Sequence, residues 1–135
     1  GQLARTKNLG ALKLVGTMSR ALHRARELDP KLDFAGPDRC LGLLYRDAPG
    51  WPVSVGNKRL ARQHLVKANE TAPAFPENLL NLVESQIAWG ETKDAKAAIP
   101  ALQAVVAKAR TNLTGDAWAA SWQDWSNRLQ RLPGP

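Results

Sequence analysis

The chain has 135 residues, 44% of them apolar and 23% charged, which predicts a single globular domain over residues 1–135 and excludes a wholly disordered chain. Its one cysteine, Cys40, excludes an intramolecular disulfide and a cysteine-based zinc site, and no apolar run approaches the roughly 18 residues that a membrane-spanning helix needs. The formal net charge is +7, with all of the excess in residues 1–72, which is typical of a solvated basic face but leaves an acidic partner, an anionic surface or nucleic acid open.

Helical periodicity runs through the chain, whereas alternating, β-branched sequence is confined to Val53-Ser54-Val55. Proline in the first turn of a helix loses no needed N–H, so Pro37 and Pro76 indicate helix starts, and Gly90 indicates a helix end. We therefore expect an all-α protein of about six helices, over about residues 4–28, 37–46, 58–70, 76–90, 92–111 and 115–132.

The middle of the chain contains an internal similarity. Small residues recur where two helices of a hairpin would approach closely, and larger apolar residues fill the seam three and four positions away. The matching segments are Leu41-Gly42-x2-Tyr45 followed by Ala61-x3-Leu65-x2-Ala68-x4-Pro73, and Leu79-x2-Leu82 followed by Ala95-x3-Ile99-x2-Leu102. Their intervals suit a helix-turn-helix repeat of about 34 residues.

These segments resemble tetratricopeptide repeats, with recognisable units over about residues 37–73 and 76–107. The resemblance implies antiparallel helix hairpins stacked into a tetratricopeptide-like superhelix, with a C-terminal capping helix over about residues 115–132. The combination of Gly36-Pro37, Leu41-Gly42-Leu43-Leu44-Tyr45, Ala48-Pro49 and Gly56 further looks like the T-component proteins of tripartite (TRAP) transporters, which are bacterial periplasmic lipoproteins. That likeness implies a periplasmic location, with a cytoplasmic one as the alternative, and a transporter solute-binding subunit as partner.

In tetratricopeptide proteins the first helix of each pair lines a concave groove, and the resemblance places the groove residues of this chain on two helices and the loop between residues 48 and 55. They are Arg39, Leu43, Arg46, Trp51, Leu80, Glu84 and Ile87. The implied function is a non-enzymatic module that binds another protein or peptide, or a small apolar solute. Because fold alone does not give function, this step is an analogy.

No set of residues indicates catalysis. His23 and His64 lie far apart in sequence with no carboxylate at a ligand spacing, so we expect a packing or surface role for both. Cys40 is expected to be a buried thiol in a helix seam, and no serine lies in a Gly-x-Ser-x-Gly turn. We therefore predict that the protein is not an enzyme and uses no metal and no cofactor.

A basic helical face is the alternative source of function. Its residues would be Arg20, Arg24, His23 or Arg26, Lys58, Arg59 and Arg62. Such a face would bind nucleic acid or another anionic surface, but it lacks the interleaved aromatic residues that stack on bases. Nucleic acid is therefore ranked below protein as the expected partner.

Tryptophan is the unusual feature of the composition, with five residues. Trp118, Trp122 and Trp125 form a stripe that either caps the repeat array or offers a partner an aromatic surface, and capping is favoured. Trp51 lies in a proline-stiffened loop that is longer than the repeat pattern requires. We expect this loop to be ordered, with Trp51 packed against the hairpin at the mouth of the groove.

Overall fold

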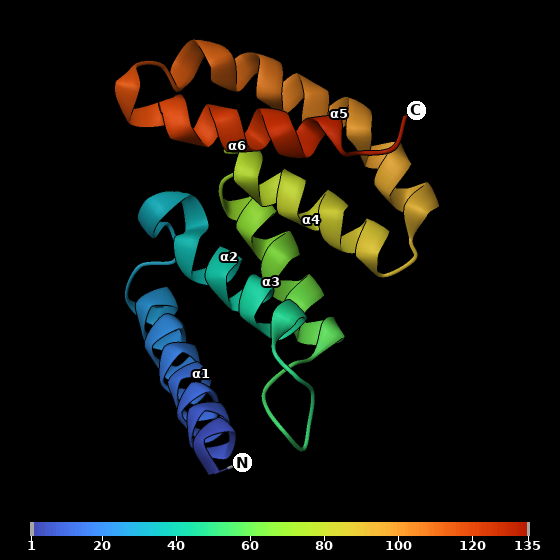
Figure 1. Ribbon diagram of the computed structural model, residues 1–135. Coiled ribbons are helices and arrows are strands. Elements are labelled where there is room, and N and C mark those ends of the chain that lie inside the picture. The colour runs from blue at the N-terminus through green and yellow to red at the C-terminus, as the bar shows by residue number, and fades with distance from the viewer. Residues whose placement is uncertain (1, 135) are drawn as a thin grey trace. The chain divides into compact units, whose positions relative to one another are not determined.

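The computed structural model describes the backbone of residues 2–134 and the side chains of residues 9–134 (Figure 1). Within this range the chain forms six α-helices and one short 3-10 helix. These are α1 (Gln2–Leu28), α2 (Leu32–Asp47), α3 (Lys58–Thr71), α4 (Pro76–Ala88), α5 (Thr92–Asn112), η1 (Asp116–Trp118) and α6 (Ala119–Gln130). The predicted all-α class is confirmed, and most of the predicted helix ends agree with these bounds to within two residues.

The chain divides into two compact units, Gly1–Thr71 and Ala72–Pro135, which we call the first unit and the second unit. The boundary falls at the end of the first predicted repeat. It also separates the charge, because the first unit has thirteen Lys and Arg residues against six Asp and Glu, whereas the second has six against six. The whole net charge of +7 therefore belongs to the first unit.

In the first unit, α2 and α3 form a helix hairpin, and α1 packs on α2 (Figure 1). The hairpin closes tightly at Gly42, where an added Cβ would lie 2.6 Å from the Leu65 side chain. Leu41, Ala61 and Leu65 are almost fully buried along this seam. The small residues of the repeat pattern thus allow the close approach that the sequence predicts.

The start of α2 contains a left-handed turn. Asp33, Phe34 and Ala35 have φ of 50°, 53° and 66°, a region that residues with a Cβ rarely adopt. Arg39, one turn further on, donates hydrogen bonds to the Phe34 carbonyl oxygen (3.0 Å) and the Asp33 carbonyl oxygen (3.2 Å). The right-handed part of α2 therefore begins at Gly36, as the proline at position 37 predicts.

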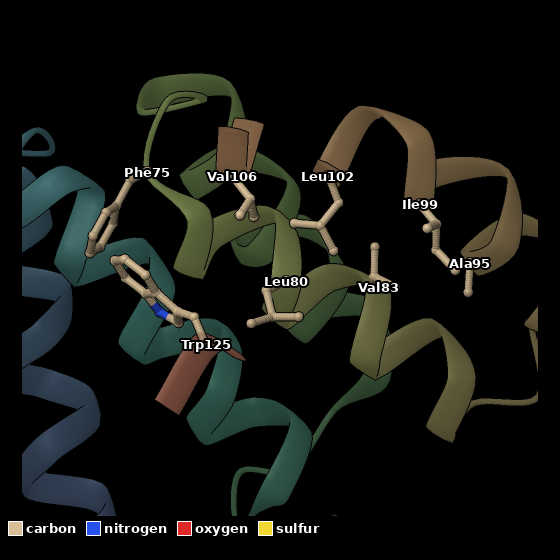
Figure 2. Close-up of a cluster of buried hydrophobic side chains, with 8 residues drawn as sticks. All are labelled: Phe75, Leu80, Val83, Ala95, Ile99, Leu102, Val106 and Trp125. Atoms are coloured by element: carbon tan, nitrogen blue, oxygen red, sulfur yellow. The ribbon is translucent and has the colours of Figure 1, made fainter. Parts of the chain in front are cut away.

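In the second unit, α4 and α5 form a second hairpin, and α6 returns along it (Figure 1). Figure 2 shows the side chains of α4 and α5 meeting in one apolar core. This core consists of Phe75, Leu80, Val83, Ala95, Ile99, Leu102, Val106 and Trp125. Trp125 is 2% exposed, and Trp118 and Trp122 pack partly buried against the same cluster, so the tryptophan stripe faces the core of its own unit.

Candidate functional site

The predicted groove residues of the first unit lie in different environments. Arg39 is 9% exposed, and its guanidinium is bonded to the left-handed turn and to the Asp33 carboxylate (3.0 Å). The prediction that Arg39 lines an open groove is therefore wrong, because this side chain stabilises the start of its own helix. Arg46 forms an ion pair with its neighbour Asp47 (2.7 Å), and Leu43 is half-buried.

The predicted groove residues of the second unit belong to its interior. Leu80 is 1% exposed and lies in the apolar core, so its predicted groove role is also wrong. Ile87 packs partly buried against the same core. Glu84 is bound by an arginine on α6, which the groove prediction did not include.

That arginine, Arg128, is the centre of an ion-pair network between α4 and α6. Its Nη2 donates to Glu84 Oε1 (2.6 Å), and its Nη1 donates to Glu77 Oε1 and to Asp124 Oδ2 (both 2.9 Å). Burial alone would lower the pKa of Arg128, but the hydrogen bonds to the three carboxylates outweigh burial and raise that pKa above its usual value. Glu77 also accepts a hydrogen bond from Trp125 Nε1 (2.5 Å), so the network is joined to the apolar core.

The loop between α2 and α3 is held by its own backbone. The Gly56 N–H donates to the Pro49 carbonyl oxygen and the Asn57 N–H donates to the Tyr45 carbonyl oxygen, both at 2.8 Å. A Cβ at Gly56 would lie 2.7 Å from the Pro49 carbonyl oxygen, so this closure requires glycine. These bonds agree with the order predicted for the loop.

At the tip of this loop, Trp51 is 89% exposed and Val53 is 60% exposed. The prediction that Trp51 packs against the hairpin is therefore wrong. The physical reason is that the loop closes on itself through backbone hydrogen bonds, at its base and in the turn at Gly50, and this leaves Trp51 in solvent. An ordered loop thus displays a large aromatic side chain.

The first unit also contains a polar cluster that the sequence analysis missed, made of His23 and Arg26 from α1, Asp38 and Tyr45 from α2, and His64 from α3. Asp38 Oδ1 accepts from Arg26 Nε (2.7 Å) and lies 2.8 Å from His64 Nδ1, which must carry a hydrogen because a carboxylate only accepts. Asp38 is fully buried, and its Oδ2 has no hydrogen-bond partner among the described residues.

The second half of the polar cluster is aromatic. His23 Nε2 shares a hydrogen bond with the Tyr45 hydroxyl (2.8 Å). Tyr45 stacks on His64 with ring centroids 5.6 Å apart, and the two imidazoles meet edge to face at 5.8 Å. The cluster thus ties all three helices of the first unit together.

Helical spacing was the signal that could have revealed this cluster. Asp38 and Tyr45 flank Leu41 at three and four positions, and His64 precedes Leu65 on the face that carries Ala61. Polar residues at seam positions are buried with the seam and must find partners there. Cys40 shows the opposite error, because its expected burial is wrong and its side chain is exposed.

Three residues of the predicted basic face have partners within the first unit. His23 and Arg26 belong to the polar cluster, and Arg24 pairs with Glu27 (3.2 Å) on the exposed side of α1. Among the described residues, no group of three His, Cys, Asp or Glu side chains is placed to hold a metal ion. None of the described helices combines the length and apolarity required to cross a bilayer.

In comparisons with known proteins, no family model and no curated protein sequence matches the chain. The resemblance to tetratricopeptide proteins and to the TRAP T-component therefore remains a prediction from the residues themselves.

Proposed function

We propose that the protein is a non-enzymatic helical-repeat module that binds another protein, and that the exposed tip of the loop after α2 is the point of contact. The observation that carries this proposal is Trp51, which is 89% exposed at the end of a loop closed by backbone hydrogen bonds. An exposed tryptophan on a flexible segment would not by itself indicate a binding site. A loop closed by hydrogen bonds instead holds the indole in a restricted set of positions.

The energetics favour such a side chain as an anchor. Tryptophan is enriched among the residues that dominate binding energy in protein interfaces, because it buries a large apolar area with few rotatable bonds. Ordering the loop before binding lowers the conformational entropy lost in the complex. Val53, 60% exposed, adds apolar area beside Trp51.

The charge of the first unit indicates the chemistry of the partner. All of the net charge of +7 lies in this unit, so an acidic protein surface is attracted over a range comparable to the Debye length. Following the resemblance to tetratricopeptide and TRAP T-component proteins, we assign the partner as a transporter solute-binding subunit in the periplasm. This assignment rests on the likeness alone.

The test compares two exposed apolar residues of the first unit. The purified protein is titrated with the TRAP solute-binding subunit from its source organism, and Trp51→Ala is expected to weaken binding at least tenfold with an unchanged melting temperature. Leu28→Ala, which removes a side chain that is 68% exposed, is the matched control and should bind like the wild type. Equal binding by all three proteins would refute the assigned contact.

The same titration distinguishes protein binding from the alternative function, which is the binding of nucleic acid. If the basic first unit binds nucleic acid, an oligonucleotide rather than the protein subunit will saturate it, with an affinity that falls steeply as salt rises. Trp51→Ala would then have a small effect on that salt dependence, because an uncharged side chain releases no counterions.

A further inference from the structure

The second unit contains a cavity at the edge of its apolar core, away from the proposed protein contact. It has a volume of about 530 Å³ and lies between α5 and the end of α6. Its floor consists of Ile99, Leu102 and Val106, and Leu129 and Leu132 form the opposite wall. A volume of this size lies within the range of small-molecule sites.

One cationic side chain lies at an end of this cavity. The lining residues of α5 follow each other at helical spacing from Ile99 to Arg110, which corresponds to about 16 Å along the helix axis. Arg110 is the last of them and the one charged residue in the lining. Apart from Gln103, the side chains that line the site before Arg110 are apolar, and Arg110 makes its end positive.

Arg110 is positioned by its neighbours and keeps its charge available. Its guanidinium carbon lies 4.6 Å from the centroid of the Trp122 ring, and Trp122 Nε1 donates to the Leu113 carbonyl oxygen (2.7 Å). None of the ion pairs among the described residues involves Arg110. This contrasts with Arg128 of the same unit, which binds three carboxylates.

We infer that this cavity binds a monoanionic amphiphile, a medium-chain fatty acid in chemical class, with the alkyl chain over Ile99 and Val106 and the carboxylate on Arg110. The apolar floor removes the alkyl chain from water, and the planar guanidinium matches a carboxylate with two parallel hydrogen bonds. The site lies in the second unit, so it is independent of the proposed contact at Trp51.

The first experiment measures binding of octanoate, decanoate and dodecanoate to the whole protein by calorimetry, below the concentrations at which they form micelles. The dissociation constant is expected to fall about fourfold with each added methylene until the cavity is filled. Dodecanol and dodecyltrimethylammonium, which share the tail but lack the anion, are expected to bind at least tenfold more weakly than dodecanoate.

Two variants test where the carboxylate and the alkyl chain of the ligand bind. Arg110→Gln should weaken dodecanoate binding about ten- to a hundredfold and leave dodecanol unchanged, because only the carboxylate uses the charge. Ala107→Phe adds a ring to an exposed lining position, so it should reduce the binding of every ligand in the series while the melting temperature stays close to the wild-type value. Arg59→Gln removes the same charge from an exposed position of the first unit and should change the binding of neither dodecanoate nor dodecanol.

Three results would overturn the inference. They are no saturable binding of dodecanoate by the wild type, equal loss in Arg110→Gln and Arg59→Gln, and full binding by Ala107→Phe. The third would show that the ligand binds elsewhere on the protein.

Discussion

The two units of the chain stabilise their helices with different chemistry. The first unit buries a carboxylate, an imidazole and a phenol between its helices and carries the whole net charge of +7. The second is neutral, gathers seven buried apolar side chains around Trp125, and keeps its ion pairs beside that core. Both units nevertheless contain a hairpin in which small residues let two helices approach.

This difference suggests that the two units rely on different interactions, one for register and the other for stability. Apolar burial supplies most folding free energy and tolerates small shifts, whereas a buried hydrogen-bonded carboxylate is satisfied in one arrangement only. We therefore expect Asp38 to set the register of α1, α2 and α3, and Trp125 to supply stability to α4, α5 and α6. Each of the following substitutions tests one side of that comparison.

The largest effect is expected for Trp125→Ala. Trp125 is 2% exposed and meets Phe75 and Trp122 at ring distances of 5.5 and 4.9 Å, so its removal leaves a cavity in the core of the second unit. The free energy of unfolding in urea should fall by about 3–5 kcal/mol. Trp51→Ala makes the same chemical change at a position that is 89% exposed and should cost less than about 0.5 kcal/mol. Similar losses for both would mean that the tryptophan core is not the source of stability.

Asp38→Ala should cause the next largest loss of the free energy of unfolding. It leaves Arg26 and His64 without their shared acceptor, and breaking such a pair costs about 3–5 kcal/mol when both partners are buried. We expect about 3 kcal/mol here, because the Arg26 side chain is 39% exposed and recovers some hydration. Asp38→Asn keeps an oxygen acceptor without its charge and should lose about half as much.

The same two Asp38 variants distinguish register from stability. If Asp38 sets the register of the three helices, both variants should broaden the amide NMR signals of α1, α2 and α3 while those of the second unit stay sharp. Asp47→Ala removes a carboxylate that is 62% exposed from the other end of α2 and is the control for charge alone. Sharp α1 signals in Asp38→Ala would contradict the proposed register role.

Arg128→Met tests the ion pairs of the second unit. Methionine keeps much of the side-chain length but leaves Glu77, Glu84 and Asp124 without their shared cation, so we expect a loss of about 2 kcal/mol. The pKa of Arg128 is raised, so its stabilising contribution is fully present below the pKa of a free arginine. The difference between variant and wild type should therefore be constant from about pH 7 to pH 10.

The control for Arg128→Met is Arg24→Met. Arg24 pairs with Glu27 on α1 with both side chains more than two thirds exposed, a geometry that contributes less than about 0.5 kcal/mol. Denaturation of both variants at low and high salt completes the test. A larger loss for Arg24 than for Arg128 would overturn the ranking.

The sequence was sufficient to predict the helices and their class, because periodicity, proline and glycine act locally. It also predicted the close approach at Gly42 and the inward face of the tryptophan stripe, since both depend on spacing along one helix. The groove residues could not be predicted in the same way. Whether Leu80 is open or covered depends on the packing of the other helices around it, which no local pattern records.

The polar cluster was not predicted, for a related reason: spacing along each helix indicates which residues are buried but not which of them meet. The sequence places Asp38 and His64 26 residues apart, and their hydrogen bond depends on the register between two helices joined by an unusually long loop. The left-handed turn at Asp33, Phe34 and Ala35 contains no glycine, so the sequence does not indicate it. Hydrogen bonds from the Arg39 side chain stabilise this turn. Hydrogen bonds of this kind join residues that are not neighbours in a local pattern, so only the structure shows them.

Apart from the controls, the smallest effects are expected at two glycines of the first unit, and they should differ in sign. Replacing glycine by alanine inside a helix adds up to about 1 kcal/mol of stability when nothing opposes it. At Gly10 an added Cβ meets no atom within 4 Å, so Gly10→Ala should raise the free energy of unfolding by that amount. At Gly42 the Cβ would lie 2.6 Å from the Leu65 side chain and 3.1 Å from its backbone nitrogen. Overpacking of this kind costs about 1–3 kcal/mol, so Gly42→Ala should destabilise by about 1 kcal/mol after the helical gain is subtracted. Urea denaturation of the two variants checks both signs, and a stabilised Gly42→Ala would show that α2 and α3 are further apart than the repeat pattern requires.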